Sequence, residues 1–294
     1  MPYTDITADM VKALCPVRPE NGHKGTFGTV LIAAGSRNMP GAQVLAASSA
    51  LRSGVGKVKV FAPSDSMDST RINCPCAVMS PWGDTVASTL RLYNEVSAGV
   101  SACAIGPGLD EEDDRSKALL GYMIETAPLL VIDAGALNII SRDRERYLGL
   151  VRQRPDKGLQ PAVLTPHPGE FRRLCGRNKD QSVSEFVSEN NCIVVYKDHY
   201  TGIYDVPGGA DVTYRNITGN NGMAKGGSGD VLTGLIAGLL AQGMKPVDAA
   251  VAGVYIHALA GEITSGEYGR RAMLPTDMVD FLSEAFFEAG WELE

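Results

Sequence analysis

The apolar positions of this chain form short continuous runs, separated by stretches of mixed apolar and polar residues. The runs cover residues 29–34, 57–61, 101–105, 129–132, 162–165 and 192–196. Runs of this length are typical of strands buried on both faces of a parallel sheet. Helical patterns lie between them, for example at 115–124 and 183–189. The alternation predicts an α/β fold, with a mostly parallel central sheet and helices on both faces.

One later segment differs from these strands because it is apolar nearly all round over helical length. It runs from Val231 to Leu240, which predicts a buried helix. The glycine-rich stretch 218–230 precedes it, so Ser228, Gly229 and Asp230 stand where the helix begins. A helix start binds anions through its unpaired N–H groups, and glycine lets a phosphate approach the main chain. Asp230 is therefore a candidate general base for phosphoryl transfer to a hydroxyl, although Asp in a first turn is also ordinary capping chemistry.

The predicted strands end in loops rich in Gly, Pro or Asp, and ligands of such sheets bind beyond the carboxyl ends of the strands. We therefore expect these loops to converge near the start of the Val231 helix. Lys197 directly follows a strand and either contacts a phosphate or faces solvent. His167 lies between two prolines and either contacts a ligand or makes a structural hydrogen bond.

Two further residues, Asp133 and Glu170, have two interpretations each, and His257 has one. Asp133 could hold a water of a magnesium ion or cap the following helix, and Glu170 could face magnesium or simply occupy a first helical turn. Neither is assigned as a metal ligand. His257 lies inside an apolar helical stretch and is interpreted as a hydrogen-bonded core residue.

The remaining segments complete a single predicted domain, residues 1–294, because no long linker or low-complexity stretch divides the chain. A short amphipathic helix begins at Thr7. The small residues of 42–51 predict a helix that another element approaches closely. The polar segment 142–157 is interpreted as a solvated surface helix and loop. Helices at 246–264 and 275–287 are expected beside the Val231 helix.

The charge and cysteine content of the chain limit the kinds of molecule it is expected to bind. The net charge is −7 and the pI is about 5.2, which argues against a nucleic-acid or anionic-membrane partner, so a phosphate must be met by local donors. No apolar run approaches the ~18 residues of a membrane span, and the start of the chain has no basic and apolar leader pattern. We expect a cytoplasmic protein, whose six cysteines are free thiols instead of a zinc site.

Several sequence blocks, taken together, resemble one known family. They are His23–Gly28, Pro40–Ala42, Gly106–Leu109, Asp133–Leu137, Thr165–Glu170 and Gly222–Asp230, in this order. The set is similar to the ADP- or ATP-dependent NAD(P)H-hydrate dehydratases, which have the ribokinase-like fold. The similarity covers roughly residues 20 to 265. We expect the epimerase domain that some members carry in front to be absent.

The resemblance implies a repair enzyme that uses ADP or ATP with Mg²⁺. Its substrates would be the S epimers of NADHX and NADPHX, the hydrated forms of NADH and NADPH, and its assembly a homotetramer. Phosphorylation of the C6 hydroxyl, with Asp230 as the catalytic residue, would make a leaving group whose elimination restores the double bond. The implied hydrate-binding residues are Ala42, Gly108, His167 and Asp230. The implied nucleotide-binding residues are Lys197, Asp198, His199, Tyr200, Thr201 and Gly229.

Two positions depart from the family pattern. Asp198 stands where the nucleotide loop usually has glycine, and its carboxylate could repel phosphate or point to ribose or solvent. Lys225 stands where the family usually has threonine, and we expect it to add a cation near the anion site.

Two other functions remain open from the sequence. A small-molecule kinase of the same fold, acting on a sugar or vitamin precursor, would share the Gly-x-Gly-Asp motif. It would not be expected to share the 165–170 block together with the early block at 23–28. A nucleotide-binding sensor without turnover would not need the base Asp230.

Overall fold

The computed structural model describes residues 3–177, 180–205 and 212–292. In these ranges the strands form one ten-stranded sheet, in the order β1-β10-β9-β8-β7-β6-β5-β2-β3-β4. Their bounds are β1 Thr4–Asp5, β2 Thr29–Ala33, β3 Lys57–Ala62, β4 Val78–Pro81, β5 Ala102–Ile105, β6 Leu130–Ile132, β7 Val163–Leu164, β8 Ile193–Tyr196, β9 Thr201–Asp205 and β10 Val212–Asn216. β9 runs antiparallel to both β8 and β10, and the other pairs are parallel. The predicted mostly parallel sheet is confirmed.

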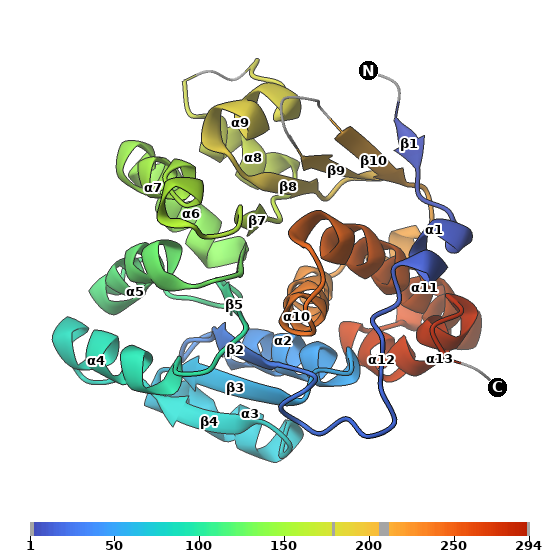
Figure 1. The fold of residues 1–294 in the computed structure, drawn as a ribbon, viewed down its shortest axis with the longest axis horizontal. Helices are drawn as coiled ribbons and strands as arrows, with labels where there is room; N and C mark the ends of the chain where they lie inside the picture. The colour runs from blue at the N-terminus through green and yellow to red at the C-terminus, as the bar shows by residue number, and fades with distance from the viewer. Residues whose placement is uncertain (1–2, 178–179, 206–211, 293–294) are drawn as a thin grey trace.

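Helices cover both faces of the sheet (Figure 1). One face carries α1 Ala8–Ala13, α2 Pro40–Arg52, α3 Met67–Asn73, α10 Ser228–Ala241, α11 Pro246–Ala272, α12 Pro275–Asp280 and α13 Leu282–Glu288. The other carries α4 Val86–Val96, α5 Asp114–Thr126, α6 Ala134–Arg142, α7 Arg144–Arg152, α8 Pro168–Cys175 and α9 Val183–Asn190. In β2, Val30 and Ile32 pack toward the α10 face, while Leu31 and Ala33 pack toward the α5 face. A strand buried on both sides must be apolar throughout, as the sequence predicted.

Helix α10 lies at the centre of its layer and packs tightly on α2. A Cβ at Gly234 would overlap the carbonyl oxygen of Ala46, and one at Gly238 would overlap the Ser53 side chain. The prediction of a close neighbour for the small-residue helix is therefore confirmed, and that neighbour is the apolar helix itself. The two backbones approach this closely because glycines face small side chains.

The interpretation of 142–157 as a solvated segment is wrong for one face of it. α7 buries Tyr147, Leu148 and Val151 against the sheet layer. Arg154 is fully buried, and its guanidinium donates to the carbonyls of Ile124 (2.6 Å) and Ala127 (2.9 Å) and to others nearby. Burial lowers the pKa of Arg154 to about 10. The segment was interpreted as solvated because it is highly charged, although it contains an apolar stripe. The arginine is buried because most of its hydrogen-bond partners come from other elements.

The C-terminal helices lie where they were predicted, but they begin and end at different residues. α11 continues to Ala272 across a break at Gly269, whose φ is +73°, and the segment 275–287 is two helices instead of one. The strands β1, β4, β9 and β10 were missed; β1 and β4 form the two edges of the sheet. No described helix is both long and apolar enough to cross a membrane.

Candidate active site

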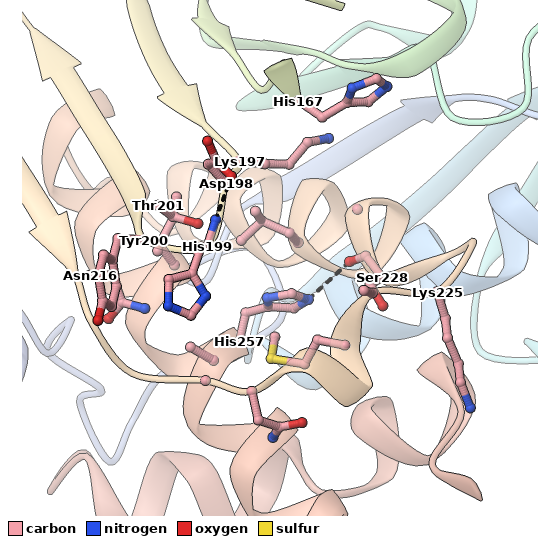
Figure 2. A pocket seen from close by; sticks show the side chains of 18 of the residues that line it. His167, Lys197, Asp198, His199, Tyr200, Thr201, Asn216, Lys225, Ser228 and His257 are labelled. Carbon is pink, nitrogen blue, oxygen red and sulfur yellow. Dashed lines mark hydrogen bonds between the residues drawn. The ribbon is translucent and has the colours of Figure 1, made fainter. Parts of the chain in front are cut away.

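A cavity of about 660 Å³ lies at the carboxyl ends of the central strands, beside the start of α10. Its walls come from the loops after β6, β7, β8 and β10 and from one face of α11 (Figure 2). It brings together most of the predicted site residues: His167, Lys197, Asp198, His199, Tyr200, Thr201, Gly229 and Asp230. The expectation that these loops converge at the helix start is confirmed.

The first turn of α10 is open toward this cavity. Its N-cap is Gly227, with φ of +105°, and no side chain caps the helix. A Cβ at Gly227 would lie 2.6 Å from Leu45 Cδ1, so glycine satisfies both the conformation and the space. The first N–H groups of α10 therefore have no capping side chain and are available to an anion. Asp230 sits in this turn, as predicted.

A buried ion pair anchors the cavity beside α10. Lys197 Nζ donates to Asp133 Oδ1 at 2.8 Å, and Thr233 Oγ1 of α10 donates to Asp133 Oδ2 at 2.7 Å. Asp133 is 1% exposed and makes no capping bond to α6, so the capping alternative for this residue is wrong. The next residue, Ala134, has φ of +46°, an uncommon conformation for a residue with a Cβ. A Cβ at Gly229 would lie 3.1 Å from Lys197 Nζ, which places the ammonium against the first turn of α10.

The environment of Asp230 favours its protonated form. Burial contributes most, followed by the negative charge of Asp133, with a smaller contribution from Glu170. Lys197 opposes them. Together they raise the pKa of Asp230 from 3.8 to about 7. A carboxyl with a pKa near neutrality can both accept and return a proton, as a general base requires.

His167 is both a helix cap and a wall of the cavity. Its Nδ1 accepts from the Gly169 N–H at 3.0 Å, and its own N–H donates to Glu170 Oε2 at 2.9 Å. Because Nδ1 accepts, Nε2 carries the proton, and it lies 3.5 Å from Glu170 Oε1. Glu170 occupies the first turn of α8, as one of its two interpretations held.

His257 is hydrogen-bonded and buried, as predicted, yet it also lines the cavity. Its ring lies 2.9 Å from the Ser228 carbonyl oxygen through Nε2 (Figure 2). Burial lowers the pKa of His257 to about 4, so the ring is neutral near pH 7. The place of His257 in the cavity wall was not predicted from the sequence. A signal existed in the spacing of Val254, His257 and Ala258, which share one helical face and all line the cavity.

The expectation for Lys225 is wrong. Its ammonium donates to the carbonyls of Arg271 (2.7 Å) and Met273 (2.5 Å) at the end of α11, and Figure 2 shows it pointing away from the other site residues. Lys225 therefore joins the loop before α10 to the end of α11 and does not add its charge to the anion site. Asp198 is exposed and accepts from the His199 N–H at 2.7 Å.

Two implied substrate residues, Ala42 and Gly108, do not line this cavity. They touch one another farther along the same sheet edge, where a Cβ at Gly108 would lie 2.8 Å from Ala42 Cβ. The early block at 23–28 precedes β2 and lies at the opposite end of the sheet. There a Cβ at Gly28 would overlap the carbonyl oxygen of Ala241, the last residue of α10.

The comparison with protein families decides what this arrangement is. Residues 30–284 match the family model described as NAD(P)H-hydrate dehydratase. The chain belongs to this family. The Bifunctional NAD(P)H-hydrate repair enzyme of Moorella thermoacetica is 37% identical over 94% of the chain, which spans 52% of that relative. The chain thus covers about half the length of the bifunctional repair enzymes it matches.

Solved structures of dehydratases and related proteins share the fold. An ADP/ATP-dependent NAD(P)H-hydrate dehydratase from Bacillus subtilis, co-crystallized with ATP/Mg²⁺, superposes with a TM-score of 0.79 at 29% identity, covering 98% of this chain and 99% of that one. A ribokinase-like superfamily protein from Enterococcus faecalis gives 0.81 at 25% identity, covering 99% and 97%. The predicted ribokinase-like fold is confirmed.

Proposed function

We propose that this chain dehydrates the S epimers of NADHX and NADPHX to NADH and NADPH, consuming ADP or ATP. One observation carries the proposal beyond family membership. Asp230, with its pKa raised to about 7, stands in the open first turn of α10 in one cavity with Lys197 and the loop 198–201. A base beside an anion site is the arrangement that phosphoryl transfer to an alcohol needs.

The reaction divides into two steps. Asp230 accepts the proton of the C6 hydroxyl while that oxygen bonds to the terminal phosphorus of the nucleotide and the old P–O bond breaks. The first turn of α10 and the Lys197 ammonium stabilise the charge on the transferring group. Phosphate then leaves with the electrons of the C6–O bond, a proton leaves the neighbouring carbon, and the ring double bond is restored.

The nucleotide and the hydrate bind side by side at the carboxyl ends of the strands. The nucleotide occupies the cavity formed by Lys197–Thr201 and Gly229, with its phosphates toward α10. The hydrate reaches Asp230 from the side of His167 and extends toward Ala42 and Gly108. These placements rest on the shared sheet edge and on the position of Asp230 between the two groups.

Magnesium fits this site as an ion held chiefly by phosphate oxygens and water. In the part of the chain that the structure describes, no group of three or more His, Cys, Asp or Glu side chains is placed to hold a metal. Both oxygens of Asp133 already accept hydrogen bonds, and Glu170 Oε2 accepts from the His167 N–H, so phosphate oxygens and water would supply most of the ligands of the ion. Mg²⁺ commonly binds phosphates in this way, and it would neutralise phosphate charge.

The assembly and location follow from the same proposal. We infer a cytoplasmic homotetramer in which residues 1–294 form one dehydratase domain. The free thiols support a reducing compartment, and the family resemblance supports the tetramer.

The test uses NADH hydrate, which lacks the near-ultraviolet absorbance of NADH. Purified protein with Mg²⁺ and ADP or ATP should restore that absorbance and release one inorganic phosphate per NADH formed. No recovery with either nucleotide, together with a stable phosphate ester formed from another alcohol, would contradict the proposal and favour a small-molecule kinase.

A further inference from the structure

The buried carboxylate of Asp133 lies next to the first turn of α10, where a phosphate would bind. A Cβ at Gly229 would lie 3.1 Å from Lys197 Nζ and 3.7 Å from Asp133 Oδ2, so a positive and a negative charge stand together against this turn. A carboxylate repels phosphate unless donors hold its oxygens and balance its charge. In the described part of the chain, two side chains donate to it, Lys197 to Oδ1 and Thr233 to Oδ2. Its orientation therefore depends on one ammonium and one hydroxyl.

Thr233 uses its hydroxyl differently from other helical threonines of this chain. A threonine inside a helix can donate to the carbonyl four residues earlier. Thr126 and Thr264 both do this, at 2.8 Å and 2.6 Å. Thr233 donates instead to Asp133, which follows β6, at 2.7 Å. Thr233 is fully buried and Asp133 is 1% exposed, so this hydroxyl is committed to the site and not to its own helix.

The contact continues from Thr233 through Asp133 to the ammonium of Lys197. A lysine carries its charge on a flexible four-carbon stem, so its position has to be fixed by a partner. That partner is Asp133, whose Oδ1 accepts from Nζ at 2.8 Å, and the Lys197 side chain is 20% exposed. Since Thr233 holds the other oxygen of the same carboxylate, it sets where Oδ1 and the ammonium lie. Asp230 precedes Thr233 by three residues on the same face of α10, so one helix positions both the base and this hydroxyl.

We propose that Thr233 is a positioning residue, whose hydroxyl holds the Asp133 carboxylate so that Lys197 keeps its ammonium at the first turn of α10. The inference rests on the proposed function, because it assumes that the transferring phosphate lies at this turn. Without the hydroxyl, Oδ2 would have no donor among the described residues, and the carboxylate would turn toward Lys197 and draw the ammonium from the phosphate. The loss would act on the charge that develops during transfer more than on nucleotide binding.

The experiment removes the hydroxyl and keeps the shape of the side chain. In Thr233→Val, kcat for NADH recovery with ADP and Mg²⁺ should fall ~10-fold or more, while the dissociation constant of ADP, measured by calorimetry, should rise by a smaller factor. Thr233→Ser keeps the hydroxyl and should restore most of kcat. Thr264→Val is the matched control, because Thr264 is also fully buried but donates within its own helix. Its kcat should equal that of the wild type.

A second variant pair separates positioning from a purely structural role. Lys197→Met removes the ammonium through which Thr233 is proposed to act. Adding Thr233→Val to Lys197→Met should therefore lower kcat little further. A structural role for the hydroxyl would give the same fold-loss in both backgrounds, which would contradict the inference.

A wild-type kcat in folded Thr233→Val would overturn the inference, as would an equal loss of kcat in Thr233→Ser. If Thr233→Val does not fold, Thr233→Cys takes its place, because a thiol is similar in size to the hydroxyl but a weak donor. Its kcat should be below that of the wild type, and a wild-type kcat would overturn the inference. Absence of NADH recovery by the wild type would instead contradict the proposed function, and the inference with it.

Discussion

At the scale of single residues, the site depends on a carboxyl that is costly to ionise. Asp230 lies near two other acids, Asp133 and Glu170, and only Lys197 offsets them among the causes of its shift. Lys197 is itself paired with Asp133, so its charge is largely committed. This is why a residue that looks like an ordinary first-turn aspartate has a pKa suited to proton transfer.

The first prediction concerns activity. Asp230→Asn should lower kcat by ~10²-fold or more, because the amide cannot accept the hydroxyl proton. In the wild type, kcat/KM should rise with pH until about pH 7 and then level off, as Asp230 loses its proton. Steady-state rates of NADH recovery across pH would measure both. A near-normal rate in the variant would remove Asp230 from the mechanism.

The second prediction concerns stability of the same variant. The folded chain holds the Asp230 proton more tightly than the unfolded chain, whose carboxyl has a pKa near 3.8. Ionisation therefore costs stability progressively from about pH 4 to pH 7, and the full cost remains above pH 7. Asp230→Asn should be more stable than the wild type at pH 8, by at most ~4 kcal/mol, and the difference should shrink toward pH 4. Urea unfolding at several pH values measures this, and a difference that grows toward low pH would contradict it.

The sequence predicted those residues whose roles follow from their place along the chain. Asp230 is next to a glycine-rich turn and an apolar helix, and Lys197 ends a strand, so both positions were evident from local pattern. The partners of Lys225 and Arg154, and the Ser228 carbonyl that His257 contacts, could not be predicted in this way. These partners are main-chain carbonyls, which any sequence supplies, and most belong to elements distant along the chain.

At the scale of elements, α10 fixes the site through close backbone approaches. Its first turn meets Lys197, and its middle rests on α2 at Gly234 and Gly238. Most helices and central strands were predictable because they are long or wholly apolar. The strands β9 and β10 were missed because they are partly polar, and pairing with their neighbours decides their conformation more than their own residues do.

The third prediction tests the anion site of α10. Gly229→Ala places a Cβ 3.1 Å from the Lys197 ammonium and into the space that a phosphate would use, so ADP affinity should fall about tenfold. Gly226→Ala is the control, because nothing lies within 4 Å of its added Cβ. Calorimetric titration with ADP measures both, and unchanged affinity in Gly229→Ala would argue against phosphate at this turn.

The fourth prediction tests the contact between α10 and α2. Gly234→Ala should destabilise the fold by ~1–3 kcal/mol or more despite the better helix propensity of alanine, because the new methyl overlaps the Ala46 carbonyl. Gly266→Ala, in an open part of α11, should instead gain ~0.5–1 kcal/mol. Urea midpoints compare the two variants. A neutral or stabilising Gly234→Ala would mean that the helices separate easily.

At the scale of the whole molecule, the loops at the carboxyl ends of one sheet meet the start of α10 and one face of α11 to form the candidate site. The alternation of apolar runs and helices was enough to predict this, because the chemistry of parallel sheets places their loops together. The distance of the 23–28 block from the cavity was not predicted. This block belongs to the same family resemblance, and similarity of sequence does not say which end of the sheet a motif serves.

The fifth prediction concerns the assembly. The proposed homotetramer should elute from a size-exclusion column with a light-scattering mass about four times that of the 31.2 kDa chain. The mass should persist on dilution if the tetramer is the stable form. A mass equal to one chain would contradict the proposal.

The close contact between the end of α10 and Gly28 has a consequence for how the sequences of related proteins can differ. The last residue of α10, Ala241, lies against the main chain of Gly28, and the first turn of α10 carries Asp230. The length of α10 therefore sets the distance between Gly28 and Asp230. One inserted residue within α10 would rotate the acid by about 100° and displace it by about 1.5 Å. Relatives that keep the activity should differ freely in their surface loops, while gaps and insertions should be missing from this one segment.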